Sequence, residues 1–321
     1  MRKLALAAAI AVTLTLGAGL AAQSASAAQT FPIRMASHDK NYFKGANAII
    51  LPTYQLTFIT ENQATAVGGG ARARNTKVLA GVDEATMRKL ADEAHADLRA
   101  QFIAAGLPVA SDETAQAMIA ANTIPLQPGN RYAVEASGGI TVNKRLRQSY
   151  ISVGATNAPL LAPYRSELAA NGANVMGMTP FNNRLVKGQP NGSLAVVPNL
   201  VIDFANMTAA AQSGLRRNTA SAGGSAVFGI RGVASGIIFA KAFGKNNVFA
   251  FYVRPEADYG VGAPFARDAA GAADVAPLSV MGESVARGDA VIVDLTAWEN
   301  LVRAAYRDYN ASIVAATLKG K

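Results

Sequence analysis

Apolar and polar residues follow a clear pattern between Asn47 and Asn122, and this stretch organises the rest of the chain. Runs with apolar groups on both faces are typical of strands covered on both sides. Apolar residues at helical spacing indicate helices that bury one stripe. The predicted elements, in chain order, are the strand Ala48–Thr60, the helix Asp83–Ala105, the strand Leu107–Ala110 and the helix Asp112–Ala121.

The helix Asp83–Ala105 has the strongest signal. Asp83 is suited to cap its first turn, and Gly106 is suited to end it in a left-handed conformation. Leu98 and Phe102 belong to its apolar stripe. We expect both side chains to be buried against a sheet.

The later part of the chain predicts further strands and one more helix. A charged residue, Asp203, interrupts an otherwise apolar strand, which is typical of a strand end or of a paired buried carboxylate. Thr296 and Glu299 have the spacing of a capping box, and Thr208–Ser225 is expected to be a mobile connection. The expected elements are the strand Leu194–Ala205, a long hairpin of Ala226–Phe243 and Val248–Arg254, the strand Ala290–Asp294 and the helix Thr296–Ala316.

The region Thr123–Asn199 gives a weaker pattern. It predicts short strands and one short helix: Tyr132–Ala136, Ile140–Val142, Tyr150–Val153 and the helix Pro163–Ala170. Together the elements predict an α/β (α+β) fold, with a mixed β-sheet, helices packed on it and one long β-hairpin in the C-terminal half. We expect a single domain over residues 47–321, with a possible subdivision near 123–193.

The first residues have the composition of a secretory signal peptide. Arg2 and Lys3 precede an uncharged apolar stretch, and Ala25-Ser26-Ala27 supplies small residues for a signal peptidase. The alternative is a membrane anchor, since the apolar stretch is long enough to span a bilayer. The small residues favour cleavage near Ala27, followed by a flexible arm over residues 28–46. The sequence therefore predicts a periplasmic or secreted protein with no transmembrane anchor after cleavage.

The chain is basic, with 30 Lys and Arg against 21 Asp and Glu, a formal charge of +9. Such a charge favours contact with an anionic lipid or glycan surface. The basic residues are not interleaved with aromatic ones, which argues against nucleic acid. A solvated basic surface with no partner is the alternative.

A glycine-rich segment, Gly68-Gly69-Gly70, precedes Arg72, Arg74 and Lys77. It fits a loose dinucleotide fingerprint, but the helix that would hold the pyrophosphate begins only at Asp83. We interpret the segment as a flexible loop whose three cations are the candidate binding residues. A second basic group, at Lys144, Arg145 and Arg147, is expected in another loop.

Catalytic chemistry has little support in this sequence. There is no cysteine and only two histidines, which excludes cysteine nucleophiles and most zinc sites. His95 is expected at the boundary of its helix, and no residue is expected to hold a metal or a cofactor. The alternative is a periplasmic hydrolase acting on an envelope glycan or lipid, with a cleft between Thr123 and Ser193.

The order of elements resembles that of the periplasmic domain of the curli secretion channel and of TolB amino-terminal domains. The segments that carry the resemblance are Ile49-Ile50-Leu51-Pro52, Ala104-Ala105-Gly106-Leu107-Pro108-Val109 and Val201-Ile202-Asp203-Phe204. The resemblance covers Asn47–Asn122 and Leu194–Arg254, and it implies a non-catalytic domain of an envelope assembly. We therefore expect an exported cell-envelope protein that acts in binding or assembly, with an envelope protein or an anionic surface as partner.

Overall fold

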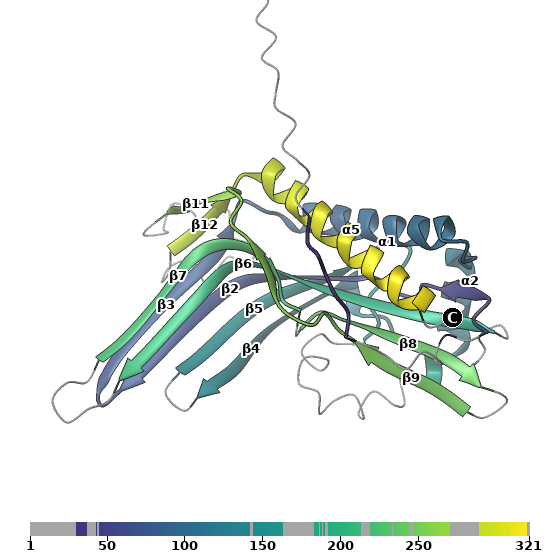
Figure 1. Ribbon diagram of the computed structural model, residues 1–321, viewed down its shortest axis with the longest axis horizontal. Helices are drawn as coiled ribbons and strands as arrows, with labels where there is room; N and C mark the ends of the chain where they lie inside the picture. Colours follow the sequence, from purple (N-terminus) through teal and green to yellow (C-terminus); the bar gives the residue numbers. More distant parts are fainter. Residues whose placement is uncertain are drawn as a thin grey trace, which may run out of the picture.

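The computed structural model describes residues 30–36, 43, 45–141, 144–162, 183–185, 187, 189, 192–212, 219–232, 234–243, 247–269 and 289–319. These residues form a mixed twelve-stranded sheet with helices packed on it, which confirms the predicted fold class (Figure 1). The short helix expected over 163–170 lies outside the described residues. The elements are β1 (Ala48–Ile50), β2 (Gln55–Gly68), β3 (Ala71–Ala80), α1 (Glu84–Ala104), α2 (Asp112–Ala121), η1 (Pro128–Asn130), β4 (Arg131–Thr141), β5 (Lys144–Gly154), β6 (Ser193–Gln212), β7 (Thr219–Ile230), β8 (Gly236–Phe243), β9 (Asn247–Val253), β10 (Tyr259–Val261), β11 (Ala266–Ala269), β12 (Asp289–Val293) and α5 (Leu295–Lys319).

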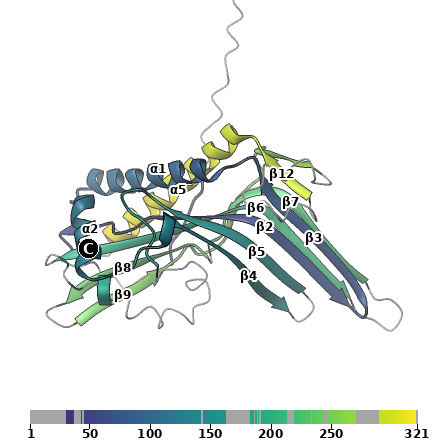
Figure 2. The same ribbon diagram turned by 180° about the vertical axis from the view of Figure 1, so that it is seen from behind.

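Strands β2 and β6, which the sequence predicts as strands, lie side by side at the centre of the sheet. They are parallel from Gln55 to Phe58, where Phe58 pairs with Ile202. Beyond this point β2 continues between β3 and β5, whereas β6 continues with β7. The sheet therefore divides into one group with β2, β3 and β5 and another with β6 and β7. The strands of both groups extend past the end of the helices (Figure 2).

The helices α1 and α5 cover the undivided part of the sheet (Figure 1). Asp83 caps α1 by accepting a hydrogen bond from the Thr86 N–H at 2.7 Å. Leu98 and Phe102 are fully buried, as expected. The ring of Trp298, from α5, lies 5.6 Å from the ring of Phe58 on β2. Large apolar side chains thus fill this part of the core.

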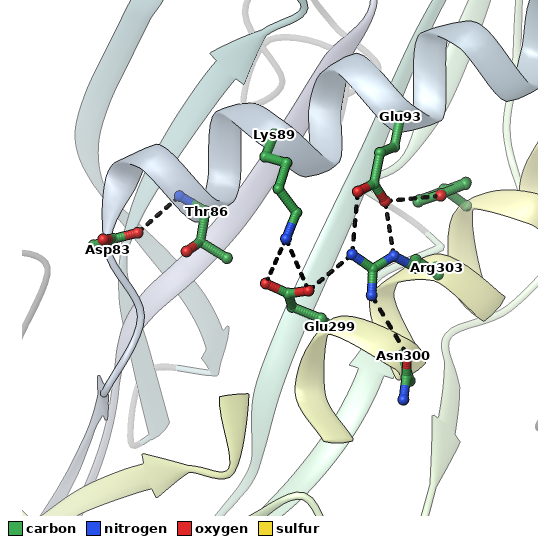
Figure 3. A network of polar contacts seen from close by, with 8 residues as sticks. Asp83, Thr86, Lys89, Glu93, Glu299, Asn300 and Arg303 are labelled. Atoms are coloured by element: carbon green, nitrogen blue, oxygen red, sulfur yellow. Dashed lines mark hydrogen bonds and ion pairs between the residues drawn. The ribbon is translucent and has the colours of Figure 1, made fainter. Parts of the chain in front are cut away.

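Ion pairs fix α5 against α1 (Figure 3). The Arg303 guanidinium donates to both oxygens of Glu93, at 2.7 and 3.1 Å, and to Glu299 at 2.8 Å. Lys89 also reaches Glu299, at 3.0 Å. The hydrogen bond from Arg303 holds the pKa of Glu93 below its ordinary value, although partial burial acts in the opposite direction. This network links the two helices across their exposed edge.

Several predicted boundaries are wrong. The strand predicted over Ala48–Thr60 is two strands, β1 and β2, separated by Leu51–Tyr54. The strand predicted over Ala226–Phe243 is also divided, because the chain turns after β7, where the N–H of Ser235 bonds the Arg231 carbonyl at 2.7 Å. The predicted hairpin is present as β8 and β9. Asp294, instead of the expected Thr296, caps α5 by accepting from the Ala297 N–H at 3.0 Å.

Two expected loops are strands. The segment after Gly68 is β3, and Thr208–Ser225 contains the end of β6 and the beginning of β7. The three short strands predicted between Tyr132 and Val153 are the hairpin of β4 and β5. Alanine, glycine, serine and threonine dominate Thr208–Gln212 and Thr219–Ser225, so these segments lack the large apolar residues by which strands are recognised.

Candidate anion-binding face

The hairpin of β2 and β3 presents the candidate binding residues. Gly69 and Gly70 form its two-residue turn, with φ angles of 52° and 93°. A turn with positive φ at both positions matches the twist of paired strands and favours glycine. Arg72 and Arg74 consequently lie on β3, a strand paired with β2, and not in the flexible loop that the sequence suggests.

One face of this hairpin is covered by the hairpin of β6 and β7. Ala64, Ala66 and Gly68 alternate along β2 on this face, and all three are buried. A Cβ on Gly68 would lie 2.8 Å from the carbonyl oxygen of Thr219 and 3.0 Å from that of Gln212. The two hairpins therefore meet backbone to backbone, through side chains that are small or absent.

The opposite face is open near the turn and carries arginines. Successive residues of a strand point to opposite sides, so Val67, Arg72 and Arg74 share this face. Val67 pairs with Arg72, and Thr65 pairs with Arg74. Arg72 and Arg74 are exposed, and Val67 is 42% exposed.

Strand β5 brings the second basic group to the other side of β2. Arg147 pairs with Gln63, and Arg145 pairs with Thr65. The Arg147 side chain is exposed. The two basic groups, separated in the sequence by the whole of α1 and α2, thus flank the same strand. We call the surface of Gln63, Thr65, Val67, Arg72, Arg74 and Arg147 the arginine face.

The spacing within the arginine face follows from sheet geometry. Arg72 and Arg74 are two residues apart on one strand, which is about 7 Å, and Arg147 is two strands away, which is about 10 Å. The Gln63 amide lies against the Arg74 guanidinium, whose Nε is 3.2 Å from the amide oxygen when that oxygen faces β3. Within the described part of the chain, no acidic group lies within ion-pair distance of Arg72 or Arg74. Both guanidinium groups are therefore available to an external anion.

Lys77, the third candidate, does not belong to this face. It lies on the other side of β3, is 5% exposed, and contacts Asp268 at 2.8 Å and Asp289 at 3.3 Å. Burial alone would lower the pKa of Lys77, but the two carboxylates outweigh it and raise the pKa. The lysine thus ties β3 to β11 and β12, which is a structural role.

Asp203 stands where β6 departs from β2. Its Oδ1 accepts from Asn62 Nδ2 at 2.7 Å and from the N–H groups of Phe204 at 2.7 Å and Ala205 at 3.2 Å. Burial raises the pKa of Asp203, opposed by the nearby Arg231 at 3.4 Å. The carboxylate therefore holds the β6–β7 hairpin against β2, because Asn62 belongs to the covered face.

His95 is buried at the contact between α1 and α2. Its Nε2 lies 4.0 Å from Asp112 Oδ1, which also accepts from Arg99 at 3.1 Å, and its ring stands edge-on to Tyr54. Burial lowers the pKa of His95, and the Asp112 carboxylate opposes this. His95 is thus more deeply buried than its expected boundary position.

Among the described residues, no group of three or more acidic or histidine side chains is arranged to hold a metal ion. None of the helices in these residues is both long and apolar enough to cross a membrane. Part of the region expected to form a cleft between Thr123 and Ser193, residues 163–182 above all, lies outside the described part. No protein-family model matches the sequence, and no curated protein or solved structure matches it significantly. Function is therefore inferred from the chain's own residues.

The sequence contains a signal for this site that the loop interpretation overlooks. Arg72 and Arg74 are separated by one alanine, and Arg145 and Arg147 by one leucine. A spacing of two is the period of a strand face. The participation of Val67, and the approach of β5 to β3 across β2, depend on strand pairing that the sequence does not reveal.

Proposed function

We propose that this protein is an exported, non-catalytic cell-envelope protein that binds an anionic partner through the arginine face. The observation that carries the proposal is that Arg72 and Arg74 of β3 and Arg147 of β5, which are distant in the sequence, lie on one face of the sheet. The other face of the same strands is covered by β6 and β7, so the arginines stand on paired, packed strands. The hydrophobic N-terminal segment with Ala25-Ser26-Ala27 supports export.

Rigid presentation matters for the affinity of such a face. Arginine side chains on a paired strand lose less freedom on binding than side chains in a mobile loop. The planar guanidinium group also forms two parallel hydrogen bonds with a carboxylate or a phosphate. A strand that carries arginines at every second position is thus suited to an extended anionic surface.

A pull-down from envelope extract tests the proposal. Wild-type protein and the double variant Arg72→Gln/Arg74→Gln are compared at low and high salt. Arg267 and Arg307 are exposed arginines of β11 and α5, so Arg267→Gln/Arg307→Gln is a control with the same change in charge. We expect a partner that wild type and control retain at low salt and that the double variant loses.

Two results would contradict the proposal. Equal retention by all three proteins would show that the arginine face is not the contact surface. Turnover of an envelope glycan or lipid by a folded protein that retains no partner would favour the hydrolase alternative. Export is tested separately, by N-terminal sequencing of the exported chain, which should begin at or near Ala28.

A further inference from the structure

We propose that the arginine face binds the phosphate groups of an anionic lipid surface. This inference rests on the proposed function and specifies the partner. Three features of the face support it: the arrangement of the arginines, the absence of aromatic rings among its described side chains, and the position of Val67.

The arginines form a plane, not a line. Arg72 and Arg74 lie along β3, and Arg147 lies on the far side of β2. With about 7 Å along the strand and about 10 Å across two strands, the positive charges of the face spread in two dimensions. A layer of headgroups presents phosphates in two dimensions, whereas a linear polymer presents them along one.

The side chains between the arginines are short, as in Thr65, or buried, as in Gln63. Thr65 separates Arg74 from β5, and the Gln63 amide lies against Arg74. Neither side chain walls off a pocket for a small ligand. The described side chains of this face also include no Tyr, Trp or Phe against which a sugar ring or a base could stack. Charge and guanidinium geometry are left as the means of recognition, and arginine is the residue best suited to phosphate.

Val67 distinguishes a lipid surface from a soluble polyphosphate. It is a large apolar side chain, 42% exposed, that pairs with Arg72 next to the turn. Beyond it lie only Gly68, Gly69 and Gly70, so no bulky side chain at the turn prevents close approach. A basic group beside an exposed apolar side chain suits the boundary between headgroups and acyl chains. A polyphosphate in water would gain nothing from Val67.

Binding to vesicles tests the inference. The protein, purified as the cell exports it, is sedimented with vesicles of phosphatidylcholine alone or of phosphatidylcholine with about one third phosphatidylglycerol. Each basic residue close to an anionic surface strengthens binding about fivefold. We therefore expect Arg72→Gln/Arg74→Gln to bind the anionic vesicles about 30-fold more weakly. Arg267→Gln/Arg307→Gln should bind like wild type, and all variants share one N-terminus, so its contribution cancels.

The variant Val67→Ser separates the two sources of phosphate. We expect it to weaken binding to anionic vesicles several-fold, and to leave binding of soluble polyphosphate unchanged. Unfolding curves that match wild type show that each variant is folded. Val67 and both arginines are exposed, and the one buried partner that these substitutions affect is the Gln63 amide beside Arg74.

Specific outcomes would overturn the inference. One is equal binding to neutral and anionic vesicles. Another is binding to anionic vesicles that the double variant retains. If polyphosphate binds tightly and Val67→Ser does not change its affinity, the partner is a soluble polyanion. If the pull-down still yields a partner that depends on Arg72 and Arg74 while vesicles fail, the proposed function stands and only the lipid assignment is wrong.

Discussion

The part of the sheet that α1 and α5 cover, which we call the base, shares strands with the hairpins that extend beyond it. The two regions differ in their side chains. Along β2, Leu56 and Phe58 lie at the base, whereas Ala64, Ala66 and Gly68 lie in the hairpin. The base is stabilised by apolar volume under α1 and α5. The hairpin is stabilised by backbone hydrogen bonds and by close approach to β6 and β7. Of these two described regions, the β2–β3 hairpin leaves one face exposed near its turn, and this is the face that carries Arg72 and Arg74.

Truncation of a large side chain at the base should have the greatest effect. Phe102→Ala removes a fully buried ring and should lower the free energy of unfolding by about 3–5 kcal/mol. The adjacent Ile103 is 56% exposed, so Ile103→Ala is the matched control and should change stability by less than about 1 kcal/mol. Chemical denaturation measures both. Similar losses in the two variants would mean that the buried stripe of α1 is assigned incorrectly.

The same contrast explains what the sequence could predict. Met87, Leu90, Leu98 and Phe102 recur at helical spacing, so α1 and its buried face are predicted correctly. β3 alternates Ala71 and Ala73, which are partly buried, with exposed arginines, and alanine does not mark a covered position as a large apolar residue would. The covered face of the hairpin is therefore invisible in the sequence.

The candidate site was predicted in part. The sequence names Arg72, Arg74 and Lys77 together as candidate binding residues of a loop, whereas in the structure Arg72 and Arg74 are exposed on β3 and Lys77 is buried. Its burial depends on Asp268 and Asp289, which approach β3 only through β11 and β12. Sequence distance conceals such pairing, because a parallel contact between β3 and β12 connects opposite ends of the chain.

Lys77 should contribute to stability, although lysine usually lies at the protein surface. Lys77→Ala removes a buried ammonium group and its bond to Asp268, so we expect a loss of about 1.5–3 kcal/mol. Lys89 forms an ion pair with Glu299 while its side chain is 52% exposed, and Lys89→Ala should cost less than about 1 kcal/mol. Thermal unfolding distinguishes the two. Equal, small effects would show that β12 does not depend on this lysine.

Close approach of the hairpins can be disturbed with a single methyl group. Gly68→Ala would bring a Cβ to within 2.8 Å of the Thr219 carbonyl oxygen, and the backbone must then shift. We expect a loss of about 1–3 kcal/mol. A Cβ on Gly262 meets no atom within 4 Å, so Gly262→Ala should be close to neutral. If Gly68→Ala were also neutral, the two hairpins would not be in contact in solution.

Low pH should lower the stability of the helix-covered part of the fold through protonation of His95. Burial lowers the pKa of His95 below its ordinary value of 6.5, with Asp112 and Asp92 acting against this shift and Arg99 with it. The unfolded chain therefore binds this proton at a higher pH than the folded chain does. The stability contributed by neutral His95 is complete above about pH 6.5 and is lost as the pH falls, by at most about 1.4 kcal/mol per pH unit.

The variant His95→Gln isolates this contribution. Free energies of unfolding are measured at pH 7.5 and 5.5 for wild type and variant, so that effects of the carboxylates cancel in the difference. Wild type should lose more stability than the variant over this interval. An identical loss in both proteins would show that His95 takes up its proton equally well in the folded chain.

The smallest effect on stability belongs to the arginine face, and it sharpens the comparison most. Arg72 and Arg74 have exposed side chains, so Arg72→Gln/Arg74→Gln should change the free energy of unfolding by no more than about 0.5 kcal/mol per residue. The same variant should lose the anionic partner at low salt. In wild type, retention should also fall as salt rises, because exposed charges are screened over about 8–10 Å at ordinary ionic strength.

A large loss of stability would show that the open face supports the hairpin after all, and the distinction between a structural face and a binding face would fail. A variant that is as stable as wild type but no longer binds would confirm this distinction. Phe102→Ala should behave in the opposite way: its stability should fall, while its arginine face is unaltered.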